Sequence, residues 1–469
     1  MSAPCDVIVL GLGTGGEDLA LRLARSGLQV VGIEADLLGG ECPYWACIPT
    51  KIMVRAANLL AEARRIDGMA GSATVTADWG QVARRVADEA AGGWDDAFAV
   101  ARFQDAGGRF VRGRGRLVGP ATVEVGDETF TASRGIVIAT GSQVAIPPIP
   151  GIADVDAWTT HDAIQATELP ASMLVLGGGA VGCELGQVFS RFGVEVTIIE
   201  GGERLLPAEE PESSEVIEAV FRSSGVSLLT GRLMREIRSD NGGCRATLDD
   251  GATVWAQKIL VAAGRRVALG DLGLETAGLD GSARTIDVDH RMRAAPGIWA
   301  LGDVTDEGMF TSKALYQGSV VFADITGSAA PPADYAALPR VTFTDPEVGS
   351  VGLTEAAARA SLDDVAVVVK AVPATFRGWL HGAGNDGVIK LVIDRSADRL
   401  VGATSVGPSG GEILGTMALA IHAKVPMSRL ADMIYAYPTF YGGIGEAVGA
   451  YARGIGKVLD PDASPYFHD

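Results

Sequence analysis

Two cysteines five positions apart, Cys42 and Cys47, are the residues of this sequence whose type and spacing best suit chemistry. Both lie in the stretch from Gly39 to Lys51. On a regular helix, residues five apart have α-carbons roughly 8.5 Å apart, whereas a disulfide requires less than about 7 Å. A bond between the two sulfurs therefore requires a distorted first helical turn, and a strained, accessible disulfide is the labile, catalytic kind. Pro49 suits the first position of the regular helix that follows, where its missing N–H costs nothing.

Two other interpretations of this pair stay open from the cysteines alone. The thiols could be inert groups packed inside a helix, or they could be half of a zinc site. Zinc needs four ligands, yet Cys5, Cys183 and Cys244 are scattered along the chain and no histidine lies near the pair. The choice between redox-active and inert thiols therefore depends on the elements that surround them.

The elements ahead of the cysteines predict a dinucleotide site. Residues 6–10 form a short apolar run typical of a buried parallel strand. Gly11, Gly13 and Gly16 follow with G-x-G-x-x-G spacing, open an amphipathic helix, and lead to a second apolar strand that ends in Glu34. Such glycines let a pyrophosphate approach the helix N-terminus, and an acid about twenty residues further on binds the ribose hydroxyls.

The same pattern recurs in the middle of the chain. An apolar run over residues 173–176 leads into Gly177, Gly179 and Gly182, then a helix and a second strand that ends in Glu200. Two separate dinucleotide folds in one chain predict two dinucleotides. A carboxylate at the position of Glu200 repels a 2′-phosphate and so favours NADH over NADPH, unless Glu200 is an ordinary surface glutamate.

The composition excludes several classes of function. A length of 469 residues predicts about three domains. With 39 basic and 58 acidic residues the net charge is −19, which argues against nucleic acid and anionic membranes as partners. No apolar run approaches the ~20 residues of a spanning helix, so we expect no membrane insertion. Five cysteines without framework spacing, and no signal-peptide pattern at the start, predict a cytoplasmic protein.

Taken in order, these motifs resemble those of the flavin-dependent pyridine nucleotide–disulfide oxidoreductases, the family of dihydrolipoamide dehydrogenase, glutathione reductase and mercuric reductase. The likeness runs over nearly the whole chain. It rests on Gly11–Gly16, Gly39–Lys51, Ala139-Thr140-Gly141, Gly177–Glu184, Gly302-Asp303 and Thr344–Gly349.

The resemblance implies an α/β fold with two Rossmann-like domains, for FAD and for NAD, and an α+β C-terminal dimerisation domain. We expect the first part of the FAD domain over residues 1–148, the NAD(P) domain over 149–264, the central FAD part over 265–333 and the dimerisation domain over 334–469. It also implies a homodimer in which each subunit supplies residues to the neighbour's active site.

The resemblance further implies specific roles. Cys42 would be the interchange thiol that meets the substrate, and Cys47 the thiol against the flavin. Lys51 would lie near flavin N5 and pair with Glu184, because a cation there favours a reduced, anionic flavin and the carboxylate offsets the desolvation of the amine. The alternative makes both ordinary helix-surface charges. The residues implied for FAD are Gly11, Gly13, Gly16, Glu34, Gly40, Lys51, Thr140, Gly141, Gly302 and Asp303, and those for NADH are Gly177, Gly179, Gly182, Glu200 and Gly264.

The chain departs from the family near its C-terminus. The disulfide-reducing members carry a His-Pro-Thr motif there, followed five positions after its histidine by a glutamate, and the histidine exchanges protons with the interchange thiol. This chain lacks both members of that pair, with Tyr437 in place of the histidine and Gly442 in place of the glutamate. An imidazole can take and return a thiol proton near neutral pH, whereas a phenol, with a reference pKa near 10, is a hydrogen-bond donor and a poor base. Glu446 is the nearby carboxylate to consider as a substitute.

We therefore expect an FAD enzyme that takes hydride from NADH and reduces a small acceptor, either quinone-like, a disulfide or another thiol-reactive compound. One alternative is a dihydrolipoamide dehydrogenase with an unconventional base. Another is a redox-sensing or interaction subunit with vestigial catalysis. Mercuric reduction is disfavoured because no cysteine follows Cys244, and no resident metal is expected.

Overall fold

A computed structural model describes residues 3–458, and the chain divides into two compact units. The first unit comprises the chain up to Ile52, Ala83–Ala145 and Gly264–Asp334. The second unit comprises Met53–Val82, Ile146–Ala263 and the chain from Tyr335 onward. Each unit is therefore assembled from segments that are distant in sequence.

The first unit is built on an eight-stranded sheet in the order β17-β18-β6-β1-β2-β3, with β4 and β5 added beside β6. The strands β3, β2, β1, β6 and β18 run parallel, as the dinucleotide motif predicts. Its central strands are apolar on both faces because helices cover them. The strands are β1 (Ala3–Leu10), β2 (Val30–Glu34), β3 (Arg109–Arg112), β4 (Arg116–Gly119), β5 (Thr122–Val125), β6 (Glu128–Ile138), β17 (Arg293–Ala295) and β18 (Ile298–Ala300).

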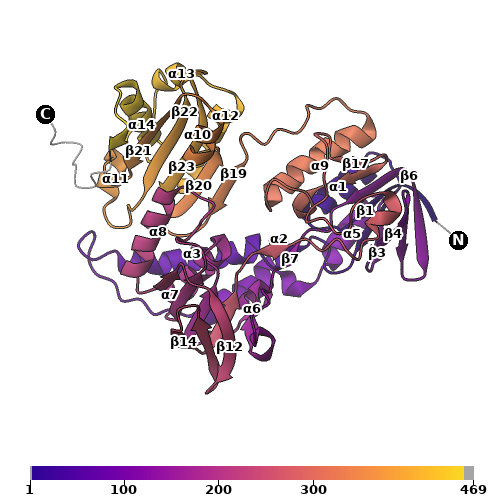
Figure 1. The fold of residues 1–469 in the computed structure, drawn as a ribbon, viewed down its shortest axis with the longest axis horizontal. Coiled ribbons are helices and arrows are strands. Elements are labelled where there is room, and N and C mark those ends of the chain that lie inside the picture. The colour runs from indigo at the N-terminus through magenta and orange to yellow at the C-terminus, as the bar shows by residue number, and fades with distance from the viewer. Residues whose placement is uncertain (1–2, 459–469) are drawn as a thin grey trace. The chain divides into compact units, whose positions relative to one another are not determined.

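Two helices of the first unit, α1 and α9, lie side by side (Figure 1). Their close approach depends on glycine, because a Cβ at Gly15 would lie 2.7 Å from the Cβ of Ala314. The helices are α1 (Thr14–Arg25), α2 (Glu41–Tyr44), α3 (Cys47–Arg64), α4 (Trp79–Arg85), η1 (Val86–Ala90), η2 (Gly92–Trp94), α5 (Ala97–Asp105), η4 (Leu274–Ala277), η5 (Gly302–Val304) and α9 (Thr311–Thr326). Helices α3 and α4 cross the limits of the unit, and β7 (Gln143–Val144) pairs with β16 (Arg265–Arg266).

The second unit opens with another parallel sheet, in the order β11-β10-β9-β15-β8, and a three-stranded antiparallel sheet. Helix α6 begins with a capping box in which Thr159 and Asp162 satisfy each other's backbone N–H groups. The elements are η3 (Ile152–Asp154), β8 (Ala157–Trp158), α6 (Thr160–Gln165), β9 (Ser172–Leu176), α7 (Ala180–Arg191), β10 (Glu195–Glu200), α8 (Pro211–Ser223), β11 (Ser227–Thr230), β12 (Met234–Asp240), β13 (Gly243–Leu248), β14 (Thr253–Ala256) and β15 (Lys258–Val261).

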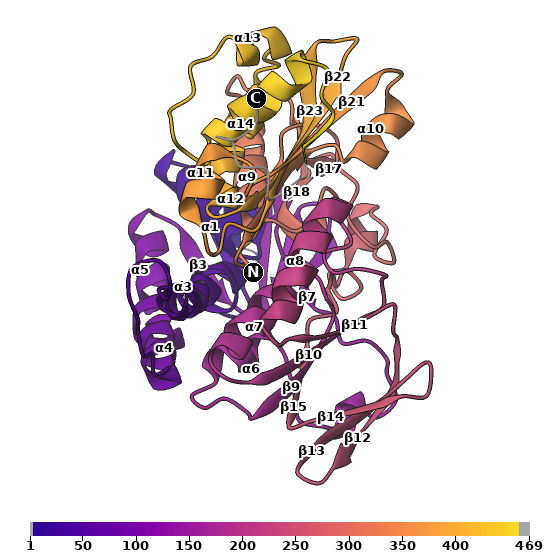
Figure 2. The same cartoon turned by 90° about the vertical axis from the view of Figure 1, so that its left-hand side faces the viewer.

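The C-terminal part of the second unit is a six-stranded sheet in the order β19-β20-β23-β22-β21-β24. Helices α12 and α14 share one hydrophobic core with this sheet, and α10 lies on its other face (Figure 2). The elements are β19 (Pro339–Thr342), β20 (Glu347–Gly352), α10 (Glu355–Ser361), β21 (Val365–Ala371), α11 (Phe376–His381), β22 (Val388–Asp394), β23 (Arg399–Gly407), α12 (Gly410–His422), α13 (Met427–Ala431), α14 (Gly442–Ala452) and β24 (Lys457–Val458).

Both predicted dinucleotide folds are present as strand, glycine turn, helix and strand: β1, α1 and β2 in the first unit, and β9, α7 and β10 in the second. Pro49 is the third residue of α3 and not the first. That place suits it equally, since the N–H groups of the whole first turn lack intrahelical acceptors. The limits of the three expected domains stay a prediction.

A buried lysine joins the C-terminal sheet to the segment that opens α8. Lys390 lies in β22, is 2% exposed, and contacts three carboxylates: Glu210 at 3.0 Å, Glu212 at 2.9 Å and Glu355 at 2.9 Å. Burial lowers the pKa of Lys390, but the hydrogen bonds to these carboxylates outweigh it and raise the pKa. The ammonium therefore stays charged and holds three elements of the second unit together.

We predict that Lys390→Met destabilises the protein by about 3 kcal/mol, because it leaves a buried carboxylate without its cation. Denaturant unfolding followed by circular dichroism measures this. Arg395→Met is the matched control, since Arg395 pairs with Asp364 on the surface and its loss should change little. Equal unfolding free energies for the two variants would contradict the prediction.

The same cluster makes stability depend on pH. Burial raises the pKa of Glu355. Lys390 and Arg359 lower this pKa by more than burial raises it, so the folded-state pKa of Glu355 lies below its ordinary value. Its contribution to stability is therefore present above the unfolded-state pKa and is lost as the pH falls through the folded-state pKa. That acid-side loss should be smaller in Lys390→Met.

Candidate active site

The glycine turn of the first unit has the shape that a dinucleotide requires. Gly11 has φ +93°, and a Cβ there would lie 2.4 Å from the carbonyl oxygen of Ala139. A Cβ at Gly16 would lie 2.1 Å from the carbonyl oxygen of Gly11, whereas a Cβ at Gly13 would meet nothing within 4 Å. The outer glycines thus allow the turn and the close packing of α1, and the middle one leaves its backbone open to a ligand at the helix N-terminus.

Two polar groups at this turn suit a bound nucleotide. Glu34 ends β2, and its two carboxylate oxygens accept hydrogen bonds from the N–H groups of Leu12 at 2.8 Å and Asp36 at 2.9 Å. These bonds hold the carboxylate at the strand end while leaving further lone pairs for hydroxyl groups. The buried hydroxyl of Thr140 has no partner among residues 3–458. A buried hydroxyl normally has one, so this atom fits a site that a ligand completes.

A second chain of polar contacts joins Asp303 to the start of the segment that carries the two cysteines. We call this segment, residues 38–47, the cysteine loop. The Ser142 hydroxyl donates to the Asp303 carboxylate at 2.5 Å, and Nε of Arg265 donates to the Ser142 oxygen at 2.7 Å. The Arg265 guanidinium also contacts the carboxylate of Glu41, one residue before Cys42, at 3.3 Å. The carboxylate predicted to hold a polyol is thereby oriented by a cation that also touches α2.

Four other glycines predicted to contact the cofactors lie near the polar contacts described above. A Cβ at Gly40 would lie 2.7 Å from Cα of Gly13, so the cysteine loop begins directly against the first glycine turn. Gly141 follows β6, and Gly264 follows β15 and accepts a hydrogen bond from the N–H of Ala145 at 3.0 Å. Gly302 opens η5 and donates its N–H to the side-chain oxygen of Gln317.

Cys42 and Cys47 belong to two different helices. Cys42 is the second residue of α2, Cys47 is the first residue of α3, and the helical path breaks at Trp45, whose φ of −130° is not helical. The distortion that the spacing requires is thus present. Both sulfurs are free thiols, both residues are partly buried, and their side chains are hydrogen-bonded to each other.

The two thiols have opposite proton affinities. A hydrogen bond from Cys42 lowers the pKa of Cys47 to about 6, against the effect of burial, and the Thr311 hydroxyl and the Lys51 charge lower it further. The Cys47 sulfur lies 3.5 Å from the Thr311 oxygen at the start of α9. The hydrogen bond to Cys47, and then burial, raise the pKa of Cys42. The reduced pair therefore holds one proton on Cys42 and a thiolate at Cys47 near neutral pH.

The glycine turn of the second unit repeats the geometry of the first. Gly177 has φ +111°, with a Cβ 2.4 Å from the carbonyl oxygen of Ala262, and a Cβ at Gly182 would lie 1.9 Å from the Gly177 oxygen. The space at Gly179 is open. Glu200 ends β10. Its carboxylate accepts hydrogen bonds from the N–H groups of Gly178 and Gly202, both at 2.6 Å. This is a second complete dinucleotide turn.

The predicted pairing of Lys51 with Glu184 stays a prediction, because these residues belong to different units. Within the first unit, Lys51 donates a hydrogen bond to the Thr50 hydroxyl at 3.3 Å. Within the second, Glu184 is buried on α7 and accepts a hydrogen bond from the N–H of Phe343 at 2.8 Å. That contact anchors the loop before β20 to α7.

Tyr437, which takes the place of the family's histidine, lies in the second unit with 66% of its surface exposed. Its ring meets Phe376 edge to face, with ring centres 5.3 Å apart. Glu446 is engaged elsewhere: it accepts a hydrogen bond from the N–H of Phe376 at 3.2 Å and pairs with Lys370 at 3.2 Å. These bonds give Glu446 a structural role, which disfavours it as a substitute base.

Sequence reasoning missed three contributors to the site: Ser142, Arg265 and Thr311. Each contacts a predicted residue from a segment far away in sequence. Ser142 and Arg265 adjoin predicted glycines, and this adjacency is the only signal that could have pointed to them.

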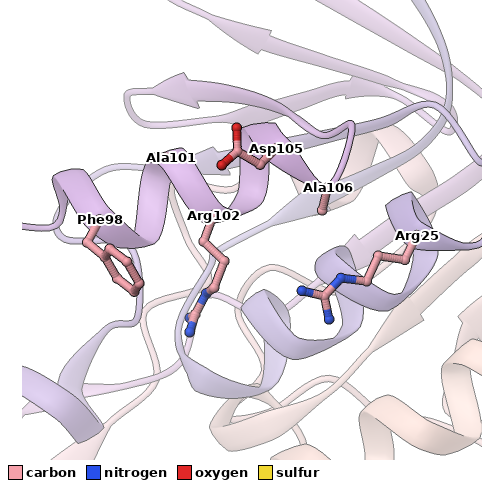
Figure 3. A pocket seen from close by; sticks show the side chains of 6 residues that line it. All are labelled: Arg25, Phe98, Ala101, Arg102, Asp105 and Ala106. Atoms are coloured by element: carbon pink, nitrogen blue, oxygen red, sulfur yellow. The ribbon is translucent and has the colours of Figure 1, made fainter.

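A cavity of about 450 Å³ in the first unit contains none of the predicted site residues. Its lining residues are Arg25, Phe98, Ala101, Arg102, Asp105 and Ala106. Figure 3 shows Arg25 and Arg102 approaching it from α1 and α5. The charge of Arg102 is already paired with Glu17, so this cavity is not where the chemistry lies.

Two features of the described residues bear on the class of site. Within residues 3–458, no three His, Cys, Asp or Glu side chains are grouped so as to hold a metal ion. The same part of the chain has no helix with the length and apolar character to cross a membrane.

Comparisons with known proteins agree with this geometry. Residues 5–318 match the family model described as pyridine nucleotide-disulphide oxidoreductase. Residues 338–448 match the model of that family's dimerisation domain. The two matches together span both glycine turns, the cysteine loop and strands β19 to β23 of the C-terminal sheet.

Individual relatives match over nearly their whole length. Dihydrolipoyl dehydrogenase of Thermus scotoductus is 34% identical, covering 97% of this chain and 99% of that protein. Mercuric reductase of Staphylococcus aureus is 29% identical, covering 97% and 83%. Among solved structures, the HOCl-induced flavoprotein disulfide reductase RclA from Escherichia coli is 26% identical with a TM-score of 0.83, covering 95% and 99%.

We predict that alkylation of Cys47 in the reduced protein follows a titration near pH 6, and that Thr311→Val moves this titration to higher pH. The reason is the loss of the hydroxyl beside the thiolate. Iodoacetamide labelling at several pH values, quantified by mass spectrometry, measures it. Thr326→Val, at the other end of α9, is the control and should leave the profile unchanged. An unshifted profile in Thr311→Val would refute this account of the thiolate.

Proposed function

The chain belongs to the pyridine nucleotide–disulphide oxidoreductase family, and we propose that it takes hydride from NADH and passes the electrons through Cys42 and Cys47 to a small disulfide or other thiol-reactive acceptor. Because the chain belongs to this family, it is an FAD-dependent NAD(P)H oxidoreductase. The observation that supports the thiol route is the hydrogen-bonded pair of thiols, with a thiolate at Cys47 held by Thr311 and Lys51.

FAD, when bound, supplies the two-electron chemistry that links a nicotinamide to a thiol pair. We assign its ADP half to the first glycine turn and Glu34, and its polyol to Asp303. The unpartnered Thr140 hydroxyl and the open space at Gly13 support this assignment. The Ser142–Arg265 contacts orient Asp303 before any ligand arrives.

The proton inventory defines what the acceptor side must do in each direction. Reducing a disulfide with NADH consumes one proton (NADH + H⁺ + RSSR → NAD⁺ + 2 RSH), so the site must deliver protons. Oxidising a dithiol needs a base that removes them. Tyr437, assigned to the acceptor side, can donate a hydrogen bond and is a poor base. The alternative of a dihydrolipoamide dehydrogenase is weakened further, because Glu446 is already paired with Lys370.

The second glycine turn supports NADH over NADPH. The Glu200 carboxylate lies at the ribose end of β10, where it would repel a 2′-phosphate. An arginine four residues further on could have offset this repulsion. However, Arg204 donates its N–H groups to the Ser214 hydroxyl and to the carbonyl oxygens of Leu206, Pro207 and Glu209. Its guanidinium is thus already engaged within the second unit.

The assembly also follows in part from the family. The match of residues 338–448 to the dimerisation domain supports a homodimer. We propose that each subunit completes the other's active site through Tyr437, and that residues 1–148, 149–264, 265–333 and 334–469 form the FAD, NAD(P), central and dimerisation parts. A cytoplasmic location is proposed from the cysteine usage.

We predict that anaerobic titration with NADH reduces the wild-type protein with two more electrons than the Cys42→Ser variant before the flavin is fully reduced. The reason is that only the wild type has a disulfide to reduce. Flavin absorbance measures the endpoint. Cys244→Ser removes a buried thiol from β13 and should behave as the wild type.

Equal electron uptake by the wild type and Cys42→Ser would refute the thiol route. Turnover of NADH with a disulfide, a quinone and Cu(II) then separates the acceptor classes; Cu(II) is included because it is bound in a solved complex of RclA. Loss of disulfide turnover in Cys42→Ser with retained quinone turnover would assign direct transfer to the quinone alone.

For the nucleotide, we predict that kcat/KM is higher with NADH than with NADPH, and that Glu200→Gln narrows the ratio about fivefold. Repulsion between two like charges about 4 Å apart in water is about 1 kcal/mol. Glu195→Gln, on the exposed start of β10, is the control. An unchanged ratio in Glu200→Gln would show that this carboxylate does not face the 2′ position.

A further inference from the structure

One short segment of the first unit contacts the cysteine loop at two separate points. The N–H of Leu38, at the start of the loop, donates to the Asp96 carboxylate at 2.7 Å. The ring of Trp94 stacks on Trp45, with centroids 5.6 Å apart and planes 22° from parallel. Asp96 is buried and also pairs with Arg112 of β3. Residues 94–96 are thus anchored to the sheet and contact the cysteine loop at its start and at Trp45.

The backbone of this segment adopts an unfavourable conformation. Gly92, Gly93 and Trp94 have φ values of 54°, 69° and 57°, three consecutive residues in the left-handed region. Glycine adopts it freely, whereas a residue with a bulky side chain does not. The Trp94 indole N–H is also buried without an acceptor in the described part of the chain. The aromatic contact that offsets this cost is the stack of the Trp94 ring on Trp45.

Trp45 stands at the point that decides how far apart the two sulfurs lie. It ends α2 with a non-helical φ, and α3 begins two residues later with Cys47. If residues 42–47 formed one continuous helix, their end α-carbons would be roughly 8.5 Å apart. A disulfide could not form at that distance without backbone movement. The break at Trp45 is what brings the thiols together.

We infer that Trp94 is a positioning residue for the thiol chemistry: its stack on Trp45 stabilises the break between α2 and α3 and thereby favours the disulfide over the dithiol. This rests on the proposed redox role of Cys42 and Cys47. In the oxidation step with glutathione disulfide, the Cys47 thiolate and the Cys42 thiol together give up two electrons and the one proton on Cys42, an S–S bond forms between them, and the S–S bond of glutathione disulfide breaks to give one glutathione thiol and one glutathione thiolate. Without the Trp94 ring, the loop can relax toward a continuous helix that separates the sulfurs.

The experiment equilibrates the FAD-loaded protein in glutathione buffers of known ratio, with glutathione disulfide as the oxidant. Alkylation and mass spectrometry then give the fraction of Cys42–Cys47 disulfide. We expect Trp94→Ala to lower the equilibrium constant for oxidation about fivefold, within the range of measured aromatic pairs. For a two-electron couple this is about 20 mV toward a more oxidising potential. Trp94→Phe, with a smaller ring, should give a smaller shift in the same direction.

Trp79→Ala is the matched control. Trp79 packs edge to face on Phe189 and Phe192 in the second unit, so its removal deletes ring contacts that do not involve the loop. We expect its equilibrium constant to equal that of the wild type. Flavin content and circular dichroism establish that each variant is folded. If Trp94→Ala does not fold, the equilibrium constant measured for Trp94→Phe tests the inference instead.

The outcomes separate this inference from the proposed function. A wild-type disulfide together with unshifted constants in the folded Trp94 variants overturns the role of Trp94 alone. A shift of equal size in Trp79→Ala also overturns it, because the effect would then be one of general stability. Absence of a Cys42–Cys47 disulfide from the wild type in every buffer instead overturns the proposed function.

Discussion

The hydrogen bond between the thiols of Cys42 and Cys47 is the interaction on which the rest of the site depends. It exists because the chain leaves the helical path at Trp45, and it gives the two sulfurs opposite proton affinities. Without the break, the thiols would be two unrelated side chains on one helix. With it, one sulfur is a thiolate, held by Thr311 and Lys51, and the other keeps the proton. By the proposed assignment the thiolate is the sulfur that faces the flavin, and Cys42, which faces the acceptor, must lose its proton before it can attack.

The two dinucleotide turns share the same local geometry but differ in the residues that surround them. In both, a Cβ on the first glycine would collide with a neighbouring strand end and a Cβ on the third with the first glycine. Both end in a glutamate held by two backbone N–H groups. They differ in what lies around them. In the first unit, Thr140 lacks a partner and Arg265 orients Asp303, whereas in the second Arg204 is already engaged by its own loop.

In the proposed function, Tyr437 takes the place of an imidazole at the acceptor side and leaves the site without a good base. A phenol supplies a proton or a hydrogen bond and accepts a proton poorly near neutral pH. The carboxylate that could have compensated, Glu446, is bound to Lys370 and to the backbone of Phe376. Because the same groups must move protons in the reduction of an acceptor and in the oxidation of a dithiol, the lack of a base at these two positions affects both reactions. The overall fold is shared with relatives named for either reaction.

The sequence alone determined the α/β class, both glycine turns, the glutamates that end their second strands and the strained spacing of the cysteines, because each is a local pattern within about thirty residues. It also showed that Tyr437 replaces a histidine. Tertiary structure alone decided which groups from distant segments meet these residues: Thr311 beside Cys47, Ser142 and Arg265 beside Asp303, and Trp94 and Asp96 beside the loop. Residues 92–96 carried no recognisable motif, since a stacked ring or a carboxylate that accepts one N–H needs no particular neighbours in sequence. Their role follows from burial and from contacts over tens to hundreds of residues, which a linear pattern does not record.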